Sequence, residues 1–199
     1  MRRIAFSAAL VWAIASSPVI VAGGAEPTNE QLLESVVRLE KLTPVLPTRV
    51  FMNPQVSRAC EPGLPSNHSL VLKSTVHQAL IQVYVTPESA AAMKTHSAKF
   101  ATGTVILKQK FASPTATHAE LYTGMFKREP GYSPDCGDWE FFTVSGDGKT
   151  LMSRGLIKKC VSCHKHYEKS DFVTKAYMPH LLPDIRKENK QYASPVTPN

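Results

Sequence analysis

The residues whose types and spacing suggest the most specific chemistry are Cys160, Cys163 and His164, in the run Cys160-Val-Ser-Cys-His164. Residues three apart on a helix project from the same side, so both thiols can reach one flat ligand. A Cys-x-x-Cys-His run is the usual attachment site of a c-type haem, in which each thiol bonds to one vinyl group. The adjacent histidine can bind the iron from the same side. We therefore predict one covalently attached haem, with His164 as iron ligand.

Two other uses of this run are a zinc site and a redox dithiol. A structural zinc ion usually needs a second ligand pair at short spacing, whereas the remaining cysteines, Cys60 and Cys136, are single and far apart. A thioredoxin-like dithiol does not need the adjacent histidine. Haem attachment therefore fits the run better than either alternative.

The N-terminus has the pattern of a secretory signal peptide, which we assign to residues 1–25. Arg2 and Arg3 precede an apolar stretch, and small residues lead to a cleavage site at Ala22 or Ala25. A membrane anchor is the alternative, but the apolar stretch is too short to span a bilayer comfortably. We expect a periplasmic protein. Export is also consistent with the haem motif, since bacteria attach c-type haem outside the inner membrane.

The charge and length of the mature chain narrow the class of protein. About 175 residues suit one domain. Without Arg2 and Arg3, the 23 basic residues fall to 21, against 16 acidic residues. This moderate surplus suits an ordinary soluble surface or an acidic redox partner. No basic run is interleaved with aromatic residues, so we expect no nucleic-acid binding.

Cys60 and Cys136 remain once the haem has taken its pair of cysteines. In an oxidising compartment two such cysteines can form a disulfide. We expect a Cys60–Cys136 bridge, with two unpaired thiols as the alternative.

The N-terminal part, residues 26–67, predicts one helix and a proline-rich extension. Thr28 with Gln31 forms a capping-box pattern, and apolar residues then recur at helical spacing until Thr43-Pro44 ends the helix. Five prolines between residues 43 and 67 exclude a regular helix there. We expect an ordered, extended connection.

Residues 68–199 predict an α+β domain, with an antiparallel sheet of about five strands packed with helices. Alternating apolar residues predict strands over 80–86, 104–111, 119–127, 138–144 and 150–155. Thr86 is expected to cap a helix that runs to about Lys99. A C-terminal helix from about Lys158 would carry the haem. This strand-rich order differs from the all-helical architectures of common c-type cytochromes.

Several stretches together are similar to the cytochrome P-460 family. They are Phe100-Ala-Thr-Gly-Thr-Val-Ile-Leu-Lys-Gln-Lys-Phe111, Met125-Phe-Lys-Arg-Glu-Pro-Gly-Tyr132, Gly137-Asp-Trp-Glu-Phe141, the haem motif and Asp171-Phe-Val173. The likeness covers roughly residues 77–178. It implies a five-stranded antiparallel sheet with helices, often a dimer, and a five-coordinate haem. It also implies two branches. One oxidises hydroxylamine and uses a lysine cross-linked to the porphyrin; the other, cytochrome c-prime-beta, lacks the cross-link and binds nitric oxide or carbon monoxide.

The resemblance makes Lys108 the first candidate for a porphyrin cross-link, followed by Lys110 and Lys94. A lysine can react in this way only when it is neutral and desolvated, because the amine must be nucleophilic. The alternative for each is a solvated charge on the surface of a strand or helix.

Residues on the far side of the iron would decide what the haem does. Glu120 is the candidate carboxylate for taking protons from a substrate, with a cross-strand or surface charge as the alternative. Five phenylalanines are available for an apolar wall, although most would simply belong to the core. They are Phe100, Phe111, Phe126, Phe141 and Phe142.

We expect one side of the iron to be open, because binding and chemistry both need a vacant position. Met178, His180 and His118 are weaker candidates for a sixth ligand, and His166 is expected on the surface. With one side of the iron open, the family resemblance implies oxidation of hydroxylamine or a related small nitrogen compound, and we expect the electrons to pass to a periplasmic redox carrier. The alternatives are binding of nitric oxide or another diatomic gas, and electron transfer. A homodimer is a further expectation.

Overall fold

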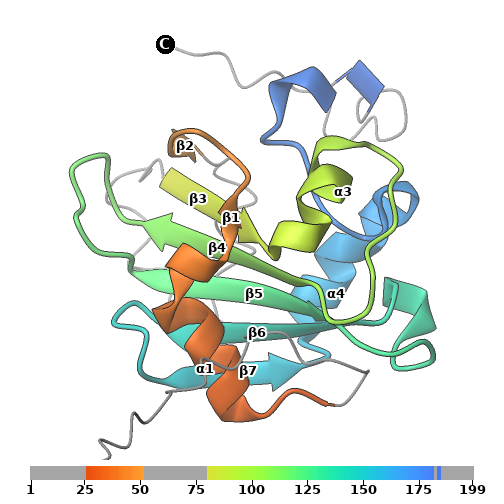
Figure 1. The fold of residues 1–199 in the computed structure, drawn as a ribbon, viewed down its shortest axis with the longest axis horizontal. Coiled ribbons are helices and arrows are strands. Elements are labelled where there is room, and N and C mark those ends of the chain that lie inside the picture. The colour runs from red at the N-terminus through yellow and green to blue at the C-terminus, as the bar shows by residue number, and fades with distance from the viewer. Residues whose placement is uncertain (1–25, 52–79, 182, 185–199) are drawn as a thin grey trace, which may run out of the picture.

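The computed structural model of the protein describes residues 26–51, 80–181 and 183–184. The predicted signal peptide, Cys60 and the rest of the proline-rich extension lie outside the described residues. Figure 1 shows helices on both sides of one twisted sheet. The domain is therefore α+β, as predicted.

Within the described residues the sheet has seven strands, and every pairing among them is antiparallel. The strand order is β1-β3-β4-β5-β6-β7, and β2 also pairs with β3. The strands are β1 (Thr43–Pro44), β2 (Val50–Phe51), β3 (Leu80–Val85), β4 (Val105–Phe111), β5 (Leu121–Lys127), β6 (Trp139–Ser145) and β7 (Leu151–Gly155). The five predicted strands are confirmed to within two residues at each end, and β1 and β2 are two short additions at the β3 edge.

Alternation along the strands gives the sheet two different faces. On β4, Val105 and Leu107 point to the cluster that includes Leu32 and Val36 of α1, which spans Asn29–Val37. Ile106, between them, belongs to the cluster on the opposite face. Figure 1 shows α1 crossing one face and α4 (Lys158–His164) lying behind the sheet.

The first helix is capped as predicted but is shorter. The Thr28 hydroxyl accepts from the backbone N–H of Gln31, and the Gln31 side chain accepts from the Thr28 N–H, which is a complete capping box. The helix ends at Arg38, whose φ of −106° and ψ of 50° are not helical. The short 3₁₀ helix η1 (Leu39–Lys41) follows, and Thr43-Pro44 then pairs with β3 instead of closing the helix.

The predicted helix from Thr86 to about Lys99 begins at Thr86 as expected but is shorter than predicted. Thr86 makes no side-chain cap bond, and the segment begins as the 3₁₀ helix η3 (Pro87–Ser89) before α3 (Ala90–Lys94). The buried ammonium of Lys175 donates to the carbonyls of Ala92, Thr95 and His96, at 2.9, 2.6 and 3.3 Å. Because these carbonyls lie at the helix end, a cation there closes the helix after Lys94.

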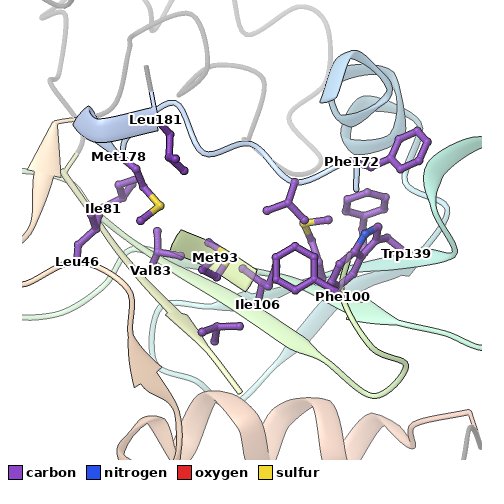
Figure 2. Close-up of a cluster of buried hydrophobic side chains, with 14 of the residues drawn as sticks. Leu46, Ile81, Val83, Met93, Phe100, Ile106, Trp139, Phe172, Met178 and Leu181 are labelled. Carbon is purple, nitrogen blue, oxygen red and sulfur yellow. The ribbon is translucent and has the colours of Figure 1, made fainter. Parts of the chain in front are cut away.

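The C-terminal part of the described chain covers the sheet face opposite α1. Helix α4 begins at Lys158, as predicted, and continues into the 3₁₀ helix η5 (Lys165–Ser170). Two further 3₁₀ helices are η4 (Pro134–Cys136) and η6 (Pro179–Leu181). Figure 2 shows Met178 and Leu181 near Ile81, with Met93 and Ile106 in the same cluster. Within the described residues, no helix combines the length and apolar character needed to cross a bilayer.

Candidate haem site

Cys160, Cys163 and His164 line one cavity of about 210 Å³ between α4 and the sheet. Because one turn of α4 separates the two cysteines, both face the cavity from the same side. The walls are mainly apolar and include Val83, Ile106, Met125, Phe141, Ile157, Val173 and Tyr177. The predicted attachment residues and iron ligand therefore meet at a single space.

The floor of the cavity consists of two rows of residues that run across the strands. One row pairs Lys108 with Thr123, Thr123 with Thr143, and Thr143 with Ser153. In this row, the Thr143 and Ser153 hydroxyls are 2.7 Å apart and share a hydrogen bond. The neighbouring row pairs Ile106, Met125 and Phe141 and is apolar. Strand register thus places one polar row beside an otherwise apolar floor.

The imidazole of His164 forms a hydrogen bond to the protein through one nitrogen, and its other nitrogen is available to bind a metal. Its Nδ1 lies 2.6 Å from the backbone oxygen of Phe172. A carbonyl can only accept, so Nδ1 carries the proton and Nε2 carries the lone pair. Burial lowers the pKa of His164 to about 4; the Phe172 carbonyl opposes this shift, and the charge of Lys108 adds to it. The ring is therefore neutral at physiological pH, as a metal ligand must be.

Lys108 lines the same cavity as Cys160, Cys163 and His164. It is half-buried and lies in the polar row of the floor. The two lower-ranked candidates lie elsewhere, because the Lys110 ammonium pairs with Glu120 and Lys94 is exposed at the end of α3. Of the three lysines, the structure brings only Lys108 to the predicted haem attachment site.

Glu120 is not among the residues that line the cavity. It lies just before β5, and its carboxylate is 3.0 Å from the Lys110 ammonium, with 39% of the side chain exposed. Lys110 is on the same strand as Lys108 but nearer its end. Glu120 therefore forms a cross-strand ion pair, which was the alternative to a role in proton transfer. The structure does not place it at the candidate site.

The candidate sixth ligands also lie away from the cavity lining. Met178 is buried in the core cluster, and His118 is exposed. His180 is exposed and contacts the backbone oxygen of Lys94 at 3.3 Å. His166 is exposed, in agreement with its expected surface position. Within the part of the chain that the structure describes, none of these side chains faces His164 across the cavity.

The residues present fit a covalently bound haem. Two half-buried thiols lie on one side of the cavity, and a neutral imidazole with a fixed tautomer lies beside them. The large apolar side chains around them, Met125 and Phe141 among them, suit a porphyrin ring. Among the described residues, no cluster of three or more His, Cys, Asp or Glu side chains is arranged to hold a metal ion.

Cys136 is a buried free thiol in the core cluster, away from the cavity lining. Burial raises its pKa to about 11, against smaller effects of nearby charges. Its expected disulfide partner, Cys60, lies outside the described residues.

Sequence reasoning missed several residues of the site. Three of them, Thr123, Thr143 and Ser153, have side chains that are common in strands, and only the strand register shows that they lie in one row. The backbone oxygen of Phe172 is another, because no sequence pattern indicates that it contacts His164. The half-buried Tyr177 also lines the cavity, and burial raises its pKa.

Comparison with protein-family models identifies the family of the chain. No curated protein matches the chain. The family model described as cytochrome P-460 matches residues 66–175, which include β3 to β7, α4 and the whole haem motif. Because this match spans more than half of the chain, the protein belongs to the cytochrome P-460 family, and that family implies a haem cofactor.

Proposed function

We propose that the protein is an exported c-type haem protein that oxidises hydroxylamine or a related small nitrogen compound. Cys160 and Cys163 would hold the porphyrin through thioether bonds to their sulfur atoms. His164 would hold the iron through Nε2, whose lone pair its tautomer leaves available. When bound, the haem would supply one-electron chemistry.

The observation that carries this proposal is the position of Lys108 in the cavity with Cys160, Cys163 and His164. A lysine amine in the lining of the haem cavity is positioned to bond to the porphyrin, because an amine can act as a nucleophile. The family resemblance associates a lysine–porphyrin cross-link with hydroxylamine oxidation. A lysine on the same strand but outside the cavity would not support the hydroxylamine-oxidising branch of the family.

Other features of the cavity suit a small neutral substrate. The apolar walls disfavour ions, while the hydroxyls of Thr123, Thr143 and Ser153 offer hydrogen bonds to a molecule such as hydroxylamine. Electrons would pass to a periplasmic redox carrier. The basic surplus of the mature chain suits an acidic face on that carrier.

A second candidate function is binding of nitric oxide or another diatomic gas. It is favoured by the apolar lining and by the lack of a carboxylate among the described lining residues. Electron transfer alone has less support. It needs a second protein ligand, and Met178, His180 and His118 do not line the cavity.

The test compares Lys108→Met with Lys110→Met, a matched control on the same strand that lies outside the cavity. Wild-type and variant haem proteins are assayed for hydroxylamine-dependent reduction of an artificial electron acceptor. Each is also digested, and the peptides are examined for a branched product joining Lys108 to Cys160 through the porphyrin. We expect Lys108→Met to lose turnover and the branched product, and Lys110→Met to keep both.

Two results would contradict hydroxylamine oxidation. One is a wild-type protein with bound haem but no turnover; tight nitric oxide binding would then establish the second candidate instead. The other is equal turnover in wild type and Lys108→Met, which would show that Lys108 has no part in the reaction.

A further inference from the structure

We infer that Asp171 is a positioning residue for His164, because it fixes the backbone carbonyl that holds the imidazole. The inference rests on the proposed haem function for its significance, since His164 is the proposed iron ligand. Asp171 itself does not line the cavity. It acts through its neighbour Phe172, whose oxygen accepts from His164 Nδ1 at 2.6 Å.

The backbone at this point is strained. Asp171 has a φ of 57° and Phe172 has a φ of 62°. Both values lie in the left-handed region, which is unfavourable for a residue with a side chain. Two such residues in succession persist only where their surroundings hold them. The carbonyl that meets His164 therefore depends on contacts outside the α4 helix.

The side chain of Asp171 supplies the first set of these contacts. Its carboxylate accepts from the Lys127 ammonium at 2.8 Å and from the backbone N–H of Phe100 at 2.9 Å. Only 4% of the side chain is exposed, so both bonds form out of contact with water. Lys99 is a weaker partner at 3.4 Å, with 70% of its own side chain exposed.

Trp139 supplies a second, independent contact. Its indole N–H donates to the backbone oxygen of Asp171 at 2.7 Å, and its ring packs edge-to-face with Phe100. Figure 2 shows Phe100, Trp139 and Phe172 gathered at one end of the core cluster. Gly137 leaves room for the Phe172 ring, since a Cβ there would lie 2.4 Å from a ring carbon. Two strands and the α3–β4 connection therefore clamp the Asp171–Phe172 turn.

This clamp has a predictable effect on the iron ligand. A histidine that donates its Nδ1–H to an acceptor is oriented by that bond and becomes a stronger electron donor to the metal. Stronger donation stabilises ferric over ferrous iron. Releasing the Phe172 carbonyl therefore weakens the iron–histidine bond and shifts the equilibrium toward ferrous iron.

The test uses Asp171→Asn and Trp139→Phe, each of which removes one part of the clamp. Lys99→Gln is the matched control, because it removes only the long, exposed contact to the same carboxylate. Resonance Raman spectroscopy of the ferrous holoprotein measures the iron–histidine stretch, and redox titration measures the ferric-to-ferrous ratio at fixed potential. In the apoprotein, ¹⁵N NMR of histidine measures the tautomer of His164.

We expect Asp171→Asn to lower the stretching frequency and to reduce the ferric-to-ferrous ratio about tenfold. A tenfold change equals about 59 mV for a one-electron couple. Trp139→Phe should lower the stretching frequency and the ferric-to-ferrous ratio by smaller amounts, and Lys99→Gln should match wild type in both. In the apoprotein, His164 should be fully Nδ1-protonated in wild type and mixed in the two clamp variants.

A purely structural role would lower the melting temperature of both clamp variants and leave the stretch, the ratio and the tautomer at wild-type values. That result would overturn the inference. If Asp171→Asn does not fold, Trp139→Phe decides by the same measures. A wild-type protein without haem would overturn the proposed function, and the apoprotein tautomer would then decide this inference by itself.

Discussion

The two faces of the sheet use the same strands for different purposes. The face under α1 is sealed: Leu107 and Val144 are fully buried there, and the Phe142 ring lies on Gly124, where a Cβ would be only 2.0 Å from it. The opposite face carries a second core cluster and, beside it, the cavity with Lys108 and the hydroxyl row. Neighbouring residues of one strand thus pack the core on one face and line the candidate site on the other.

The largest expected difference between the faces comes from two adjacent residues, Phe142 and Phe141. Phe142→Ala should reduce the free energy of unfolding by about 3–5 kcal/mol, because it empties a close-packed site. Both residues border the existing cavity, but Phe141 belongs to the cluster on the cavity side of the sheet, and its ring lies 5.0 Å from the His164 ring between centroids. Phe141→Ala should therefore cost roughly half as much in the apoprotein. Urea denaturation measures both, and equal costs would show that the cavity face is packed like the sealed one.

A somewhat smaller effect is expected from the charge cluster on the α1 side. Glu140, with 3% of its side chain exposed, bridges Arg128 at 2.7 Å and Arg154 at 2.8 Å. Arg154 also donates to the carbonyl of Pro27, which joins the start of the α1 segment to β7. Glu140→Gln should cost about 2–3 kcal/mol, since it leaves two partly buried cations without their counter-charge.

Glu34→Gln is the control for that substitution. Glu34 forms an exposed pair with Arg38 one helical turn away, which contributes within about 0.5 kcal/mol. If the two variants unfold at the same urea concentration, the buried cluster does not anchor the α1 segment.

The smallest expected effect belongs to the cavity face and depends on pH. The pKa of His164 falls from its ordinary 6.5 to about 4 in the folded apoprotein. Between these values the unfolded chain binds a proton that the folded chain does not, so stability falls as the pH drops from 6.5 toward 4. The loss should be at most about 2 kcal/mol, because water screens a partly exposed ring.

His164→Gln isolates this contribution. Thermal melts of the two apoproteins from pH 7 to pH 4 should converge as the pH falls. Parallel curves across that range would show that the imidazole is not held neutral by its surroundings.

Local patterns predicted much of the fold and the part of the site on one helix. Period-two alternation located five strands, and the capping box at Thr28 located the start of α1. The haem motif needed only one turn of helix to bring its three residues together. Each of these features depends on residues close in sequence, which is why they could be recognised.

Features that depend on register and on distant contacts could not be recognised. The position of Glu120 beside Lys110 follows from the β4–β5 pairing, and the end of α3 follows from Lys175, which comes from the C-terminal part of the chain. The left-handed Asp171 and Phe172 have no glycine to signal their conformation. The carbonyl that fixes His164 was therefore invisible in the sequence.

The most direct test of the account is the intact mass and optical spectrum of protein matured with a competent c-haem assembly system. The account predicts one haem per chain that survives denaturation and acid–organic extraction, is lost in the Cys160→Ala/Cys163→Ala double variant, and gives a five-coordinate, high-spin ferric spectrum. A colourless or zinc-containing protein, or a haem that extracts freely from the wild type, would contradict it.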